Sequence, residues 1–185
     1  MRVIYPMKVT WEDKKLTQEA LAGPCVIFSN HNSLVDGLYL TRYLKKYKVS
    51  TYVAKDWYDK PKFNWIFRST PYIPMERKQL DTAWMEEGKE KLRKGESVYI
   101  FPEGHLTPCD EYDEFKPGFL MLAKQTDATL IPIYLEKGFQ LFRCTRVVIG
   151  KPLLLDLKEK GRPSQVLKKH AMTCREEVIR LGSLI

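Results

Sequence analysis

The stretch Gly23-Pro24-Cys25-Val26-Ile27-Phe28-Ser29-Asn30-His31 (GPCVIFSNH) decides the fold class of this chain. A Gly-Pro pair precedes the short apolar run Cys25–Ser29, a pattern typical of a strand buried on both faces. A helical pattern follows over about residues 34–47, with apolar side chains near one face and lysines at its end. A buried strand followed by a helix is the beginning of an α/β arrangement.

The same alternation continues along the rest of the chain. Strands are predicted over Val49–Ala54, Ser97–Phe101, Thr129–Leu135 and Cys144–Gly150, with a short extended piece at Thr70–Met75. Helices are predicted over Gln79–Lys94, Pro117–Thr126 and Pro163–Leu181. We therefore predict an α/β fold with a mostly parallel mixed sheet flanked by helices. Residues 1–185 are predicted to form a single domain, with the motif-bearing part at about 23–150 and a C-terminal helix at about 163–181.

Composition excludes several classes of protein. The chain has 185 residues, of which 44% are hydrophobic and 29% charged, values that rule out a disordered or collagenous chain. No apolar run approaches the ~18 residues of a membrane span, so we expect an intracellular domain that is soluble or bound to a surface. Lys and Arg number 31 against 23 Asp and Glu, a net charge of +8. That excess favours nucleic acid, an anionic membrane or a phosphorylated substrate, and does not choose among them.

The cysteines and the common nucleotide motifs give negative results. Cys25, Cys109, Cys144 and Cys174 form no CxxC pair, so neither a disulfide framework nor a zinc site is expected. Cys25 and Cys144 each begin an apolar run, which predicts buried thiols. The sequence has no G-x-G pair, no P-loop motif and no G-x-S-x-G elbow, which excludes those nucleotide-binding and hydrolase signatures.

A histidine and an aspartate follow the first strand. His31 lies directly after it, at the edge where open α/β sheets place ligands. Ser33 and Asp36 have the spacing of a capping box, with Asp in place of Glu, and this would let the loop fold back so that the Asp36 carboxylate accepts a hydrogen bond from His31. Such a bond fixes the imidazole tautomer and leaves the other ring nitrogen as a base near neutral pH. Without an adjacent nucleophile, the pair suits deprotonation of a substrate hydroxyl. His170, on the apolar stripe of the last helix, is instead expected to be a core residue.

Three further strings carry polar groups near strand ends. Residues 101–105 (FPEGH) place Glu103 and Gly104 after a core strand, although a plain turn explains them equally well. Residues 73–77 (IPMER) end in Arg77, whose planar fork suits phosphate, although most single arginines are only solvated. Residues 115–118 (FKPG) place Lys116 before a helix start.

Together these strings resemble the glycerolipid acyltransferase family, which contains the 1-acylglycerol-3-phosphate acyltransferases. The family motif N-H-x-[ST]-x-x-D matches Asn30, His31, Ser33 and Asp36, and the second motif ends in an arginine matched by Arg77. The motif F-P-E-G-[TS]-R-S matches residues 101–104, F-K-x-G matches residues 115–118, and a V/I-P-[IV] strand matches residues 131–133. Their order and spacing agree over roughly residues 23–150.

The resemblance implies a fold and a reaction. The fold would be like that of the glycerol-3-phosphate acyltransferases. The reaction would move a fatty acyl group from a thioester, acyl-CoA or acyl carrier protein, to the free hydroxyl of a lysophosphatidate-like acceptor in phospholipid biosynthesis. No metal or prosthetic group would be needed, because the thioester is a co-substrate.

The resemblance also assigns roles to residues. His31 would be the general base and Asp36 its orienting partner. Arg77 would hold the phosphate of the acceptor, Glu103 and Gly104 would bind its glycerol, and nearby backbone amides could stabilise the oxyanion.

One departure bears on the acceptor. The family's T-R-S is replaced here by His105-Leu106-Thr107, so an arginine expected near the phosphate is missing. Either His105 or Lys116 replaces it, or the acceptor is a different lysophospholipid.

A basic and aromatic segment bears on localisation. Residues 55–68 (KDWYDKPKFNWIFR) have the composition of an interfacial membrane segment, although their aromatics could equally pack inward. We expect a cytoplasmic protein, peripheral to the inner face of the membrane.

Three alternatives remain open. The chain could be a basic nucleic-acid-binding module, although that leaves His31 and Asp36 without a purpose. It could be a thioesterase or lipid hydrolase acting through Ser33 or Cys109, or a lipid-binding protein without catalysis. Our prediction favours the acyltransferase and no nucleic-acid partner.

Overall fold

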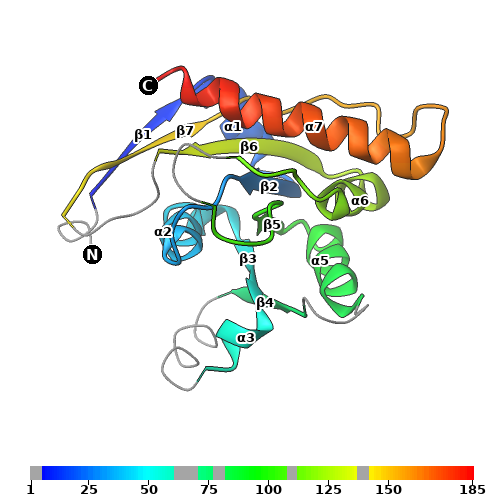
Figure 1. Ribbon diagram of the computed structural model, residues 1–185, viewed down its shortest axis with the longest axis horizontal. Helices are drawn as coiled ribbons and strands as arrows, with labels where there is room; N and C mark the ends of the chain where they lie inside the picture. Colours follow the sequence, from blue (N-terminus) through cyan, green and yellow to red (C-terminus); the bar gives the residue numbers. More distant parts are fainter. Residues whose placement is uncertain (1–5, 61–70, 77–81, 108–111, 137–141) are drawn as a thin grey trace.

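A seven-stranded sheet forms the centre of the computed structural model, which describes residues 6–60, 71–76, 82–107, 112–136 and 142–185. The strands are β1 (Met7–Trp11), β2 (Cys25–Ser29), β3 (Val49–Ala54), β4 (Tyr72–Met75), β5 (Ser97–Ile100), β6 (Thr129–Leu135) and β7 (Thr145–Ile149). Their order across the sheet is β1-β7-β6-β2-β5-β3-β4 (Figure 1). Neighbours pair in parallel except β6 and β7, which are antiparallel.

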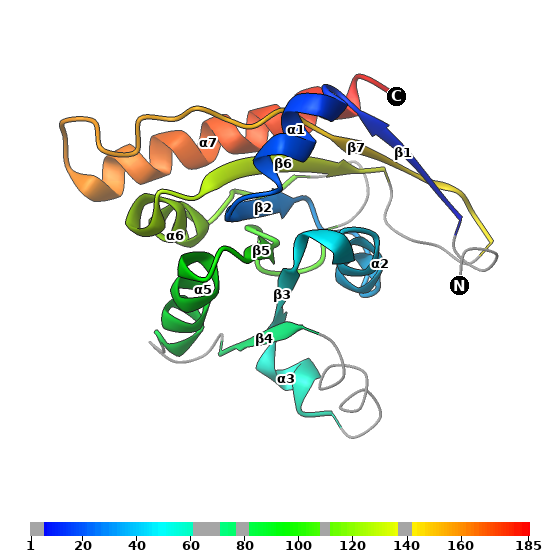
Figure 2. The same ribbon diagram turned by 180° about the vertical axis from the view of Figure 1, so that it is seen from behind.

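Helices cover both faces of this sheet. They are α1 (Lys14–Ala20), α2 (Asp36–Tyr43), the 3₁₀ turn η1 (Lys45–Tyr47), α3 (Lys55–Tyr58), α5 (Ala83–Arg93), α6 (Gly118–Thr126) and α7 (Pro163–Gly182). In Figure 1, α2 lies on one side of the lower strands while α5 and α6 lie on the other. Figure 2, seen from behind, brings α1 to the front and places α7 behind the sheet.

The strand β2 shows why the sequence builds this layered arrangement. All of its residues are buried, and they alternate between two apolar cores. Cys25 and Ile27 pack in the core beneath α2, together with Leu40 and Leu44. Val26 and Phe28 belong to the opposite core, under α5, α6 and α7. A strand covered on both faces needs apolar residues at every position, which is why its sequence is a continuous apolar run rather than an alternating one.

The predicted α/β fold with a mostly parallel sheet flanked by helices is confirmed, and each predicted strand and helix is found within a few residues of its expected bounds. Three elements of the described structure were not predicted: β1 and α1, both before residue 24, and the short helix α3. Strand β1 pairs on one side only, with β7, and its residues are exposed or half-buried, so it lacks the apolar run that marks β2.

Two local predictions are wrong. Ser33 is not the N-cap of a helix, because α2 begins at Asp36 with Val35 as its N-cap and no side-chain cap. Cys144 is exposed rather than buried, since it precedes the first residue of β7 instead of lying within the strand. Cys25 and Cys174 are buried as thiols.

A membrane-spanning helix and a cluster of metal ligands are both absent from the described residues. No helix there is long and apolar enough to cross a bilayer. No group of three or more His, Cys, Asp or Glu side chains in the same part of the chain is arranged to hold a metal ion.

Candidate functional site

The sequence-predicted site residues meet at one edge of the sheet. His31 follows β2, and Phe101, Glu103 and Gly104 follow β5. Because β2 and β5 are neighbouring parallel strands, with Phe28 opposite Ile100, their carboxyl ends lie side by side. Ligands of open α/β sheets bind at this edge.

The imidazole of His31 lies against the Asp36 carboxylate. His31 Nδ1 is 3.3 Å from Asp36 Oδ2, and the same oxygen accepts hydrogen bonds from the backbone N–H groups of Asn32 (2.9 Å) and Ser33 (2.8 Å). The Asp36 side chain is fully buried, while His31 is 14% exposed. An ionised carboxylate only accepts hydrogen bonds, so Nδ1 carries the proton and Nε2 is left with a free lone pair.

The ring of Phe101 lies flat against the same imidazole. Its centroid is 3.8 Å from that of His31, and the two planes are inclined by 19°. In the sequence, Phe101 is recognisable only as the first position of the F-P-E-G motif. Its contact with His31 joins the ends of two strands that are distant in sequence, so no local pattern predicts it. The stacked ring restricts rotation of the imidazole, whose edge then stays directed at Asp36.

Asn30 fixes the chain where β2 ends. Its side-chain Oδ1 accepts from the backbone N–H of Leu135 (2.8 Å), and its Nδ2 donates to the carbonyl of Leu135 (2.8 Å). A side-chain amide thus continues the hydrogen-bond ladder between β2 and β6 by one more step. The Asn30 side chain therefore holds the beginning of the His31 loop to the sheet.

Gly104 allows a lysine to approach the strand end. Its φ is +78°, a conformation that favours glycine, and a Cβ there would lie 2.8 Å from Lys116 Nζ. The backbone N–H of Lys116 donates to the carbonyl of Pro102 (3.0 Å), which joins the two loops. The Lys116 ammonium group thus lies over the backbone that leads away from β5.

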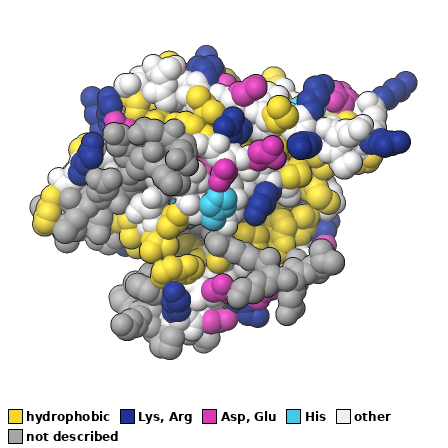
Figure 3. Space-filling model, viewed as in Figure 1, with side chains coloured by type: hydrophobic (Ala, Val, Ile, Leu, Met, Phe, Trp, Pro, Cys, Tyr) yellow, Lys and Arg dark blue, Asp and Glu magenta, His cyan; other side chains and the backbone are white. Residues whose placement is uncertain are grey.

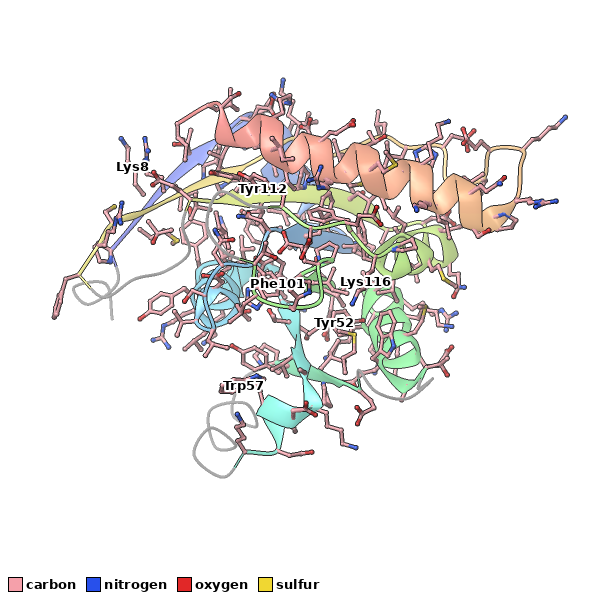
Figure 4. All side chains as sticks on the ribbon, in the orientation of Figure 1. Lys8, Tyr52, Trp57, Phe101, Tyr112 and Lys116 are labelled. Carbon is pink, nitrogen blue, oxygen red and sulfur yellow. The ribbon has the colours of Figure 1, made fainter. Side chains whose placement is uncertain are left out.

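An apolar cavity of about 460 Å³ opens beside His31. Figure 4 shows Phe101 and Tyr52, two of its lining residues, between α2 and α5, and Trp57 at α3. On the face seen in Figure 3, hydrophobic side chains gather in patches between the charged ones. The cavity is lined by His31, Leu34, Val35, Gly37, Leu38, Thr51, Tyr52, Val53, Ala54, Trp57, Tyr72, Met75, Ile100, Phe101, Gly104 and Leu106. Its size falls in the range of small-molecule sites, ~300–1,000 Å³.

The loop after Gly104 is tied to the C-terminal helix. His105 Nε2 is 2.6 Å from Asp113 Oδ2. Arg175, on α7, donates to the backbone carbonyls of Tyr112 (2.7 Å) and Asp113 (3.0 Å). Neither Asp113 nor Arg175 was singled out from the sequence, because nothing in their local patterns distinguishes them from solvated surface charges.

The remaining candidates fall elsewhere. Arg77 and Cys109 lie outside the described residues. Burial raises the pKa of the Cys25 and Cys174 thiols to about 12, so both stay protonated and unreactive at neutral pH. His170 is a core residue as expected, 7% exposed, with Nε2 3.1 Å from the carbonyl of Asp156.

Comparison with known proteins identifies the family. A family model described as Acyltransferase matches residues 8–136, which is most of the chain and contains the first six strands in chain order, except for Met7 at the start of β1. The chain belongs to the Acyltransferase family.

Individual relatives carry more specific names. The chain is 28% identical over 145 residues to the 1-acyl-sn-glycerol-3-phosphate acyltransferase BAT2 of Brassica napus, chloroplastic, covering 70% of this chain and 41% of the relative. It is 30% identical over 118 residues to a 1-acyl-sn-glycerol-3-phosphate acyltransferase of Pseudomonas aeruginosa, covering 62% and 45%. The chain thus spans less than half the length of these curated relatives.

A solved structure supports the fold. The crystal structure of the 1-acyl-sn-glycerophosphate (LPA) acyltransferase PlsC from Thermotoga maritima superposes with a TM-score of 0.68. The match covers 96% of this chain and 72% of that one at 21% identity. In this Acyltransferase-family chain, the matched residues 8–136 contain the His31–Asp36 pair, the 101–107 loop and the whole lining of the cavity.

Proposed function

We propose that this chain transfers a fatty acyl group from a thioester to the free hydroxyl of a lysophosphatidate-like acceptor, as a step of phospholipid biosynthesis. The observation that carries the proposal is the histidine at the cavity wall. His31 Nδ1 is engaged by Asp36, so Nε2 is the nitrogen left to act as a base beside an apolar cavity. The names of the relatives from Brassica napus and Pseudomonas aeruginosa support the choice of acceptor.

His31 would act first as a base and then as an acid. Nε2 takes the proton of the acceptor hydroxyl while the hydroxyl oxygen attacks the carbonyl carbon of the thioester. The product of this attack is a tetrahedral intermediate. The C–S bond then breaks, the ester remains, and the leaving thiolate takes the proton back from the imidazolium. The Asp36 carboxylate stabilises the imidazolium between these two steps.

The cavity would receive the acyl chain. Its walls are supplied mainly by apolar side chains of α2, β3 and the ends of β4 and β5. A fatty chain binds such a surface through the removal of apolar area from water. The reaction needs no metal or prosthetic group, since acyl-CoA or acyl carrier protein enters as the second substrate.

The acceptor phosphate would lie near Lys116 and Gly104. The Lys116 ammonium group next to Gly104 offers a positive charge at the cavity that Gly104 and His31 both line, and Arg77, which lies outside the described residues, would supply a second. His105 is already engaged with Asp113, so Lys116 is the better replacement for the arginine missing from the family motif.

Attachment to the inner face of a membrane would bring the lipid acceptor to this site. Leu34 and Leu106 line the cavity and are 56% and 41% exposed, so apolar side chains surround its opening. The Lys60 ammonium group lies 3.4 Å from the centroid of the Trp57 ring, in the described part of the basic, aromatic segment. The net charge of +8 favours an anionic lipid surface.

The test is an assay with defined substrates. The purified chain is incubated with acyl-CoA or acyl carrier protein and with lysophosphatidate or other lysophospholipids, and the products are read by mass spectrometry. We expect a diacyl product whose rate falls ~10²–10⁴-fold in His31→Ala. The control is His170→Ala, which removes a histidine of α7 that is not among the cavity-lining residues and should keep the wild-type product. Free fatty acid alone would identify a thioesterase, and the absence of turnover with every pair would refute the proposal.

A further inference from the structure

The loop after β5 turns back and contacts the backbone of His31. Gly104 makes the sharp turn with a φ of +78°, and three residues later the backbone N–H of Thr107 donates to the carbonyl of His31 at 2.8 Å. Thr107 is 3% exposed. A residue of the loop after β5 thus holds the backbone carbonyl of His31, which lies in the loop after β2.

Glu103 lies within the same small network. Its side chain is 1% exposed, and its carboxylate Oε2 accepts a hydrogen bond from the Thr107 hydroxyl. Burial raises the pKa of the Glu103 carboxyl, while the Thr107 hydroxyl and the backbone N–H of His31 oppose the shift. Oε1 has no hydrogen-bond partner among the residues that the structure describes. Burying a carboxyl group with a single side-chain hydrogen bond costs free energy, so Glu103 does not stabilise the core as an apolar residue at this position would.

These contacts form a chain that ends on the His31 backbone. The Glu103 carboxylate accepts from the Thr107 hydroxyl, and the Thr107 backbone N–H donates to the carbonyl of His31. The His31 backbone is therefore held by Thr107, which Glu103 holds in turn, whereas Asp36 and Phe101 contact its ring. Two separate sets of contacts determine where Nε2 lies.

We propose that Glu103 and Thr107 are positioning residues, which hold the His31 backbone so that its imidazole faces the cavity, and that Glu103 does not contact the acceptor. This replaces the glycerol-binding role that the family resemblance implies for Glu103. The proposal rests on the proposed function only for its kinetic readout, because the position of His31 can be measured without any substrate.

The variant Thr107→Val removes the hydroxyl and keeps the shape and the backbone N–H. The Thr107 backbone then loses the side-chain contact with Glu103 that fixes it on the His31 carbonyl. Thr107→Ser keeps the hydroxyl and is the rescue variant. Thr126→Val is the matched control, because the Thr126 hydroxyl donates to the Leu122 carbonyl on α6, away from the site.

The first measurement is the ¹H–¹⁵N spectrum of the His31 ring in the substrate-free protein. Wild type, Thr107→Ser and Thr126→Val should show one set of His31 signals with the proton on Nδ1. Thr107→Val should show broadened or doubled His31 signals. An unchanged His31 spectrum in Thr107→Val would overturn the proposal, and this result does not depend on whether the chain is an acyltransferase.

The second measurement separates kcat from KM. Thr107→Val should lower kcat about tenfold, the effect of losing a hydrogen bond to a charged group, with KM for both substrates within about twofold of wild type. Thr107→Ser should restore kcat. A higher KM for the acceptor at unchanged kcat would show that the pair touches substrate, and an equal loss of kcat in Thr126→Val would show a general structural effect. Should Thr107→Val fail to fold, Glu103→Gln is measured in the same two ways, with the same expected change in the His31 signals and in kcat.

Discussion

The His31 imidazole and the Phe101 ring are stacked, with centroids 3.8 Å apart and planes inclined by 19°. The two residues follow neighbouring parallel strands, β2 and β5. The stack therefore joins the histidine of the N-H-x-[ST]-x-x-D motif to the phenylalanine of the F-P-E-G motif. The stack covers one face of the His31 ring, while the Nδ1 edge is directed at Asp36. The aromatic residue of the 101–104 motif therefore touches the proposed general base directly.

The variant Phe101→Leu tests the contribution of this stack. A stacked aromatic pair contributes ~0.5–1.5 kcal/mol beyond its buried area, which corresponds to a loss of about 2- to 10-fold in kcat if the stack orients the base. The control is Phe115→Leu, which removes a similar ring from the core face that contacts Phe28. It should lower the free energy of unfolding while leaving kcat near wild type. Equal kcat in the two variants would show that the stack has no catalytic role.

The contacts of Asp36 predict a separate effect for Asp36→Asn. Asp36 Oδ2 accepts hydrogen bonds from the backbone N–H groups of Asn32 and Ser33 and contacts His31 Nδ1. The amide oxygen of an asparagine is a weaker acceptor than a carboxylate, and it carries no charge to stabilise an imidazolium. We expect kcat to fall by roughly 10²-fold, with KM for the acceptor nearly unchanged. The exposed Asp56, in the first turn of α3, provides the matched Asp→Asn control. Steady-state kinetics on both variants measures kcat and the acceptor KM. If the main effect of Asp36→Asn were a higher acceptor KM, Asp36 would belong to the acceptor site instead.

Short sequence motifs predicted part of this site. The rest of it depends on contacts between residues that are distant in sequence. His31 and Asp36 could be paired from sequence because a single loop contains both. Three other contacts depend on the order of the strands or on a loop that folds back, which no pattern in a single sequence encodes. They are the hydrogen bond of the Asn30 side chain with Leu135, the stack of Phe101 on His31, and the hydrogen bond of the Thr107 hydroxyl with Glu103. The buried central strands were found because continuous apolar runs are distinctive, whereas the edge strand β1 was not.

The raised pKa of Glu103 predicts how stability depends on pH. In the unfolded chain this carboxyl titrates near 4.5, and burial raises its pKa in the folded protein. The folded state therefore holds the proton more tightly, and wild type loses stability as pH rises from about 4.5 through the higher folded value. Glu103→Gln does not titrate, so its free energy of unfolding relative to wild type should rise across this window while its kcat falls.

Urea unfolding at several pH values measures this difference. The control is Glu90→Gln on α5, whose exposed carboxylate has its pKa lowered by a hydrogen bond from Lys94. Its relative stability should change little with pH, and in the opposite sense. A Glu103→Gln curve parallel to wild type at every pH would mean that the buried carboxyl titrates normally.

Close packing of α5 on the cavity wall predicts a coupled pair. A Cβ at Gly88 would lie 1.8 Å from the Tyr52 hydroxyl oxygen, which donates to the carbonyl of Trp84 at 3.1 Å. Gly88→Ala should therefore destabilise the fold by about 1–3 kcal/mol, as overpacking does. Tyr52→Phe removes the clashing oxygen and one hydrogen bond, at about 1 kcal/mol. The double variant should be more stable than the sum of the two single losses predicts, and strict additivity in urea unfolding would show that the hydroxyl does not oppose the added methyl group.

The exposed leucines at the cavity opening predict where a membrane would contact the protein. Leu34 and Leu106 are 56% and 41% exposed and both line the cavity, whereas Leu154 is 96% exposed and is not among the cavity-lining residues. An aspartate that replaces a side chain inserted into lipid is costly twice, since it loses apolar contact and meets anionic headgroups. In co-sedimentation with vesicles of phosphatidylcholine and phosphatidylglycerol, Leu34→Asp and Leu106→Asp should bind several-fold more weakly than wild type. Leu154→Asp carries the same change of charge and should bind as wild type does. If all three variants lose binding equally, the attraction comes from net charge alone, and the cavity opening is not the surface that faces the lipid.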